Sequence, residues 1–152
     1  MSITTKTGDK GYSSILGRRV KKDDRIFEAV GTIDELQSII EDEQIQKDLY
    51  EIMGEIACGN KITNYELRIT NLEKEIEKLE KKLKPVTKFL IFKKEKARKL
   101  NWTRTVCRRA ERKVVALRNY KLRITNYELI VVYLNRLSDY IYLLSRQEEE
   151  RG

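Results

Sequence analysis

The chain has 152 residues, with only one proline and seven glycines, and this composition is typical of a mostly helical protein. Its length suits a single domain, and the absence of histidine excludes histidine-containing metal sites and histidine-based catalytic triads. The net charge of +8 is uneven, because residues 84–123 carry fifteen lysines and arginines against two glutamates. An anionic partner is therefore expected at this segment. Nucleic acid, a nucleotide polyphosphate and an acidic membrane surface all satisfy that requirement.

The longest apolar run, Leu129–Leu134, is far shorter than the roughly twenty residues needed to span a bilayer. The N-terminus lacks the apolar stretch of a secretory signal. Cys58 and Cys107 are too few for a disulfide framework, and we expect both to be reduced thiols. These features predict a cytoplasmic protein without a membrane span.

Residues 1–24 predict an ordered loop or a short hairpin, ahead of a helical remainder, 25–152, in the same domain. The stretch from Thr5 to Ser14 combines two glycines, several hydroxyl side chains and two lysines. Such a loop can direct backbone N–H groups, hydroxyls and ammonium groups at phosphate oxygens. It lacks the Gly-Lys-Ser/Thr ending of a P-loop, and a plain flexible N-terminal loop is the alternative interpretation.

Apolar residues at helical spacing predict five helices, which would form an antiparallel bundle with short connections. Thr32 and Glu35 would form a capping box if the first helix starts late. The heptad pattern of the third helix is too short for a coiled coil, and Pro85 is expected to end that helix. The apolar positions of the first three helices fall within residues 29–40, 49–57 and 69–83, and the last two helices are expected at about 102–117 and about 126–146.

An eight-residue element, Asn64–Asn71, recurs at residues 119–126 with seven of its eight residues identical. Two copies with different surroundings do not predict a solenoid. Our hypothesis is that repeated DNA was spliced in frame into connecting segments. It predicts that these residues are tolerated surface.

Arg104, Arg108 and Arg112 are each four residues apart, so a helix would place them in one stripe. Stacked like charges repel one another, and an anionic ligand would offset that cost. Glu111, three residues from Arg108, could hold its guanidinium for bidentate phosphate contact. A solvated arginine face is the structural alternative.

Asn135 and Asp139 share a face of the last predicted helix, where they could meet a ligand, a neighbouring subunit or solvent.

Five strings in order resemble the PduO-type ATP:cob(I)alamin adenosyltransferases. They are Thr5-Lys-Thr-Gly-Asp-Lys-Gly11, Lys22-Asp-Asp24, Gly31-Thr-Ile-Asp-Glu-Leu36, Arg104-Thr-Val-Cys-Arg-Arg-Ala-Glu-Arg112 and Asn135-Arg-Leu-Ser-Asp139. The resemblance implies an all-α five-helix bundle assembled as a homotrimer, with ATP and corrinoid meeting between subunits. ATP with Mg²⁺ and cobalamin would be the substrates, and the product could be handed to an adenosylcobalamin-dependent enzyme. Neither nucleic acid nor a membrane is then expected as a partner.

Residue by residue, the resemblance implies ATP contacts from the N-terminal side by Thr5, Lys6, Thr7, Gly8, Ser13, Ser14 and Lys22. It implies that the helices complete the ATP site with Arg108, Arg109, Glu111, Arg112 and Asn135, of which Arg108, Glu111 and Arg112 would be catalytic. Asp34 and Arg104 would form a salt bridge between subunits. No residue is assigned to a metal.

The implied reaction is attack of cobalt(I) on the 5′ carbon of ATP with loss of triphosphate. Family members usually read Phe-x-Leu-Pro-Gly-Gly before the arginine helix, whereas this chain reads Phe89-Leu-Ile-Phe-Lys-Lys94. Phe89 or Phe92 would crowd the lower face of the corrinoid, and Lys93 and Lys94 would be costly to bury beside that ring. Two alternatives follow: an impaired member that binds ATP as a corrinoid carrier or nucleotide-responsive protein, and a basic helical nucleic-acid binder.

Overall fold

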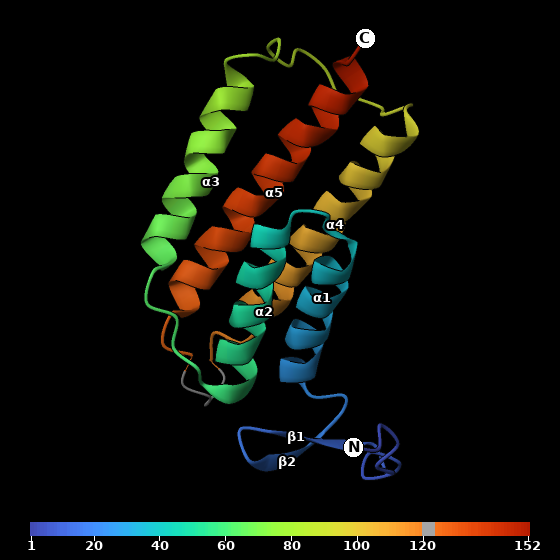
Figure 1. The fold of residues 1–152 in the computed structure, drawn as a ribbon, viewed down its shortest axis with the longest axis vertical. Coiled ribbons are helices and arrows are strands. Elements are labelled where there is room, and N and C mark those ends of the chain that lie inside the picture. The colour runs from blue at the N-terminus through green and yellow to red at the C-terminus, as the bar shows by residue number, and fades with distance from the viewer. Residues whose placement is uncertain (120–123) are drawn as a thin grey trace.

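The computed structural model describes residues 1–119 and 124–152 and shows a mostly helical protein with a small two-stranded sheet (Figure 1). The predicted hairpin is confirmed. Strands β1 (Tyr12–Ile15) and β2 (Arg18–Lys21) pair antiparallel, and the turn between them is Leu16-Gly17. Both turn residues have positive φ, 49° and 70°, as a tight two-residue hairpin turn requires.

Five helices follow within the described residues, as the apolar periodicity predicts. Figure 1 shows α5 between α3 and α4, with α1 and α2 covering one half of that layer and the hairpin at the adjacent end. The helices are α1 (Arg25–Ile39), α2 (Glu43–Cys58), α3 (Tyr65–Glu80), α4 (Glu95–Val115) and α5 (Tyr127–Glu150). None of them is long and apolar enough to cross a membrane.

The first helix begins earlier than a capping box at Thr32 would require. Asp24 is its N-cap, and the Asp24 carboxylate accepts a hydrogen bond of 3.0 Å from the backbone N–H of Ile26. The Thr32 hydroxyl instead donates to the carbonyl of Glu28 at 2.6 Å, one turn back in the same helix. The condition for a capping box at Thr32 and Glu35 is therefore not met, because the helix starts at Arg25 with Asp24 as its N-cap.

Two other helix boundaries differ from the predicted ones. Helix α3 ends at Glu80, before Pro85, so the proline does not itself stop the helix. Helix α4 starts at Glu95 rather than near Trp102, although its first two turns are rich in charge. A contact with α5, described below, stabilises this start.

The predicted core of the last two helices is confirmed, with one exception. Leu144 is partly exposed and lines a cleft. The fully or nearly buried residues are Val106, Ala110, Val114, Leu117, Leu134, Leu137 and Ile141.

Cys58 and Cys107 are free thiols, and burial raises the pKa of Cys107.

The first copy of the repeated element is not tolerated surface. Tyr65, 1% exposed, donates from its hydroxyl to the carboxylate of Glu55 at 2.8 Å. Asn126, the last residue of the second copy, donates to the other oxygen of Glu55 at 2.7 Å and to the carbonyl of Ile62 at 2.9 Å. Glu55 is itself 2% exposed. The hypothesis is wrong for these positions, because both copies bind one buried carboxylate; residues 120–123 of the second copy lie outside the described residues.

A second buried carboxylate, Asp48, also joins these helices. The hydroxyl of Tyr133 on α5 donates to Asp48 at 2.8 Å, and the guanidinium of Arg68 on α3 donates at 2.9 Å. Burial, and then the charge of Asp48, raises the pKa of the Tyr133 phenol. Asp48 and Glu55 together connect α2 with α3 and α5 within one chain.

Candidate functional site

The N-terminal loop gathers hydroxyl and ammonium groups beside the hairpin. The hydroxyls of Thr5 and Thr7 lie 2.9 Å apart, and Lys6 between them has a left-handed φ of 60°. A Cβ added to Gly8 would lie 2.8 Å from the Nζ of Lys22, so the absence of a side chain at Gly8 lets that ammonium approach the loop. Among the predicted ATP contacts, the structure therefore brings Thr5 next to Thr7 and Gly8 next to Lys22.

One further residue supports this loop. Arg19 on β2 donates from its guanidinium to the carbonyl of Thr7 at 2.7 Å. Arg19 belongs to the basic run Arg18-Arg19-Val20-Lys21-Lys22, and no sequence pattern marks it as a contact of the loop. Ser13 and Ser14 lie on β1, opposite Val20 and Arg19. The hairpin is attached to the bundle where Leu16 donates its backbone N–H to the carbonyl of Ala57 at 3.1 Å.

The arginines of helix α4 fall into two groups, one paired within the chain and one exposed. Arg109 is paired with Glu35 of α1, and Lys113, four residues further along α4, pairs with Glu28 at 3.2 Å. These cations hold α4 against α1. Arg109 is therefore already paired with another helix of the chain, unlike Arg108 and Arg112, the other arginines predicted for the ATP site.

Arg108 and Arg112 lie on the exposed part of α4. The guanidinium of Arg108 is 4.0 Å from the Glu111 carboxylate, at the limit of an ion pair, as the three-residue spacing predicts. Arg112 forms no ion pair with another described residue. Two guanidinium groups one turn apart are therefore available to an anion.

The loop and the arginines do not meet in one chain. Within the described residues, no hydrogen bond or ion pair connects the Thr5–Ser14 stretch with Arg108 or Arg112. Asn135 on α5 is half-buried, and its carbonyl accepts from the Ser138 hydroxyl at 2.8 Å.

Asp34 and Arg104 are also apart within the chain. Arg104 donates from Nε to the side-chain oxygen of Asn101 at 2.8 Å and lines a cavity of about 370 Å³ between the 86–92 segment, α4 and α5. Asp34 instead lines a hollow along α1, α2 and the start of α3, with Tyr50 and Arg68. Both side chains therefore lack this partner in a single subunit.

The cavity beside Arg104 is lined by aromatic rings. Phe92 and Tyr142 pack edge to face, with ring centroids 6.3 Å apart and an interplanar angle of 81°. Phe89, the predicted corrinoid contact, is 93% exposed at its rim. Tyr142 was missed by sequence reasoning, because an aromatic residue on an amphipathic helix is most simply a core residue.

Lys93 and Lys94 do not carry the burial cost that the sequence suggested. Both side chains are exposed, and their backbone N–H groups donate to the Glu149 carboxylate at 3.1 and 3.0 Å. The Lys94 ammonium donates to the backbone carbonyl of Arg151 at the surface, so neither charge is buried. The expectation that they are costly beside the aromatic ring is therefore wrong.

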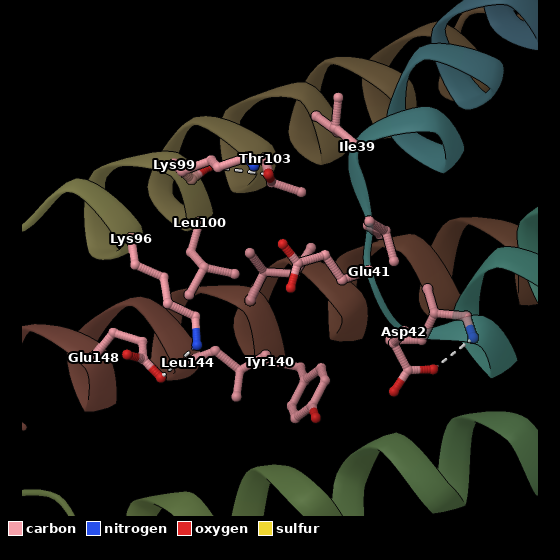
Figure 2. Close-up of a pocket in the computed structure, with 13 residues that line it drawn as sticks. Ile39, Glu41, Asp42, Lys96, Lys99, Leu100, Thr103, Tyr140, Leu144 and Glu148 are labelled. Carbon is pink, nitrogen blue, oxygen red and sulfur yellow. Dashed lines mark hydrogen bonds and ion pairs between the residues drawn. The ribbon is translucent and has the colours of Figure 1, made fainter.

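A separate cleft lies between the α1–α2 connection, α4 and α5 (Figure 2). Its walls include Leu100 and Leu144, the Glu41 side chain projects into it, and Lys96 pairs with Glu148 at 3.2 Å along one side. None of the residues predicted for the site lines it. The cleft is open because α1 and α2 are shorter than α4 and α5, so they cover only part of that layer.

The described residues form a five-helix protein with an N-terminal loop rich in hydroxyl and lysine side chains, an exposed arginine pair and an aromatic cavity beside Arg104. The family model for cobalamin adenosyltransferase matches residues 3–148. The chain belongs to the cobalamin adenosyltransferase family.

Curated relatives and solved structures agree with this assignment. The chain is 39% identical to the corrinoid adenosyltransferase MMAB of Bos taurus, over 95% of this chain and 70% of the relative. It is 34% identical to the corrinoid adenosyltransferase of Bacillus subtilis, over 100% and 89% of the two chains. A phenylalanine-to-histidine variant of the PduO-type ATP:corrinoid adenosyltransferase from Lactobacillus reuteri, complexed with cobalamin and ATP, superposes with a TM-score of 0.86. It is 28% identical over 97% of this chain and 91% of that one.

Proposed function

We propose that this protein transfers the 5′-deoxyadenosyl group of ATP to the cobalt of cob(I)alamin, giving adenosylcobalamin and triphosphate. Membership of the family and the names of the relatives support this activity. The observation that carries it in this chain is the exposed pair Arg108 and Arg112, because two open guanidinium groups one helical turn apart suit a polyphosphate.

The reaction needs no side-chain nucleophile. The electron pair of cobalt(I) forms the bond to C5′ of ATP, and the bond from C5′ to the phosphate oxygen breaks, so its electrons leave with triphosphate. The protein then has two tasks, to align the reactants and to stabilise the charge that develops on the leaving group. Arg108 and Arg112 would perform the second task, with Glu111 orienting Arg108.

The N-terminal loop would hold the other side of ATP. The paired hydroxyls of Thr5 and Thr7 and the Lys22 ammonium beside Gly8 present donors and positive charge in one place. Lys6, Ser13, Ser14, Arg109 and Asn135 remain proposed ATP contacts on the resemblance alone. Mg²⁺ would arrive on the phosphates as part of the substrate. In the described parts of the chain, no group of three or more acidic or cysteine side chains is placed to hold a metal.

We further propose a homotrimer whose sites lie between subunits. Two separations within the chain support it: the loop makes no polar contact with the exposed arginines, and Asp34 and Arg104 line different cavities. A neighbouring subunit could bring each pair together. Asp34 and Arg104 would then form the salt bridge that fixes the subunits.

The corrinoid would occupy the aromatic cavity next to Arg104. Phe89 at its rim and Phe92 against Tyr142 offer apolar faces to the ring system. We place this activity in the cytoplasm, with hand-over of the product to an adenosylcobalamin-dependent enzyme.

The decisive experiment mixes the protein with ATP and chemically reduced cobalamin without oxygen and follows the visible spectrum. Conversion to the light-sensitive spectrum of adenosylcobalamin, with one triphosphate released per product, is the expected result. ATP binding without conversion would instead favour the impaired carrier, and steeply salt-dependent binding of nucleic acid would favour the third class. Either of these outcomes contradicts the proposed transfer.

A further inference from the structure

The end of α5 meets the segment that carries the two phenylalanines. The backbone N–H groups of Lys93 and Lys94 donate to the same carboxylate oxygen of Glu149, at 3.1 and 3.0 Å. The Lys94 ammonium also donates to the carbonyl of Arg151. Three hydrogen bonds therefore attach this short segment to the last turn of α5 and the residue that follows it.

These bonds hold the N-cap of α4 and the residue before it to another helix. Lys94 is the N-cap of α4 and offers no side-chain acceptor to its own helix. The first N–H groups of a helix lack intrahelical partners, and a carboxylate there is also favoured by the helix dipole. The hydrogen bond from Lys94 and then that from Lys93 lower the pKa of Glu149, so the carboxylate is charged at neutral pH.

A second contact holds the same segment one residue earlier. Phe92 packs edge to face against Tyr142, which lies two helical turns before Glu149 on α5. Phe89, in contrast, is 93% exposed and is not held by packing. The position of the Phe89 ring therefore depends on where the backbone from residue 89 to 94 is anchored.

We propose that Glu149 is the positioning residue that presents the Phe89–Lys94 segment to the corrinoid, and that it replaces the conformational role of the glycine turn absent from this chain. The proposal rests on the proposed adenosyl transfer. Glu149 acts through the backbone of Lys93 and Lys94 and touches neither substrate. Glu149 is needed most when the Phe89 ring must crowd the lower face of cob(II)alamin before the cobalt is reduced.

The test compares Glu149→Ala and Glu149→Gln with the matched control Glu148→Gln. Glu148 is the neighbouring acid, and it pairs with the side chains of Lys96 and Arg151 instead of with backbone N–H groups. Adenosylation is measured with cob(II)alamin plus a reductant and with cob(I)alamin supplied already reduced. The visible spectrum of bound cob(II)alamin reports directly whether its axial ligand has been lost.

Glu149→Ala should slow the cob(II)alamin reaction about tenfold, with less than about a twofold change for cob(I)alamin, and should weaken the spectral change. Glu149→Gln should recover part of the loss, because its amide oxygen still accepts. The control should change neither rate. Trp102, the single tryptophan, lies in the second turn of α4, and its fluorescence shows whether that helix stays folded.

An unchanged ratio of the two rates in both Glu149 variants overturns the inference, as does an equal effect in the control. If Glu149→Ala unfolds, the ratio of the cob(II)alamin rate to the cob(I)alamin rate is compared between Glu149→Gln and the wild-type protein instead. A wild-type protein that adenosylates neither form would refute the proposed function and this inference together. Wild-type activity with an unaltered ratio in the variants would refute the inference alone.

Discussion

Charged side chains are paired in the buried contacts among α2, α3 and α5, whereas they are left open on the exposed face of α4. Glu55 is almost fully buried, and both of its oxygens are occupied, by Tyr65 and by Asn126 of the same chain. Arg108 and Arg112 are exposed, and their closest intrachain ion pair is the 4.0 Å contact to Glu111. Charges satisfied inside the chain stabilise the fold, whereas charges left open indicate where a ligand or a neighbouring subunit binds.

The largest effect is expected from breaking the buried side of this comparison. Glu55→Ala leaves the Tyr65 hydroxyl and the Asn126 amide without their acceptor and opens a cavity. The free energy of unfolding should fall by about 3 kcal/mol, measured by urea denaturation. Glu77→Ala on exposed α3 is the control and should change stability by less than about 0.5 kcal/mol. Equal losses in the two variants would show that the buried contacts contribute nothing special.

Removing an exposed arginine should leave the stability of the protein unchanged and weaken its binding of ATP. Arg108→Ala and Arg112→Ala should each weaken ATP binding by about 1.5–3 kcal/mol, because each removes charge-assisted hydrogen bonds to triphosphate. Lysine at either position should restore little, since it lacks the planar fork. Isothermal titration with ATP measures the effect, and wild-type affinity in either alanine variant rejects the role.

The proposed subunit contact predicts an intermediate effect. Asp34→Arg should loosen the trimer and weaken ATP binding together, and swapping the two charges with Arg104→Asp should restore part of both. A coupling energy of about 1–2 kcal/mol is expected for a pair in direct contact. Sedimentation measures assembly, and a single variant that stays fully trimeric would show that the pairing does not exist here.

The smallest effect on stability is expected at Phe89, because its side chain is already exposed. Phe89→Ala should change the free energy of unfolding by less than about 0.5 kcal/mol. Its activity should nevertheless fall more with cob(II)alamin than with cob(I)alamin, while ATP binding is retained. Equal losses with both forms, or none with either, would remove Phe89 from the corrinoid site.

The changed Phe89–Lys94 segment also leads us to expect slow adenosylation or loose corrinoid binding in the wild-type protein. Relative to Pro-Gly-Gly, its backbone has fewer accessible conformations. Initial rates at saturating ATP, compared with those of the Bacillus subtilis relative, measure this expectation. Rates equal to the relative's would show that the anchored segment works as well as the glycine turn.

The helices and their core faces could be predicted because helix periodicity is a local property of the sequence. The repeat at three and four residues identified the five helices in the described part of the chain, and the spacing of four placed Arg104, Arg108 and Arg112 along one helix. Helix boundaries were less predictable. The start of α4 at Glu95 depends on Glu149, more than fifty residues away, and no local pattern contains that contact.

The amino-acid order alone contains the composition of the loop, the arginine spacing and the five ordered strings that indicate the family. Only the tertiary structure showed that Arg109 is occupied by Glu35 while Arg112 is open, since helix packing decides which turn of α4 faces α1. Only the structure showed that Asn126 and Tyr65 share Glu55. Hydrogen bonds between distant residues depend on how the helices pack, and packing follows from the sum of many contacts rather than from any one motif.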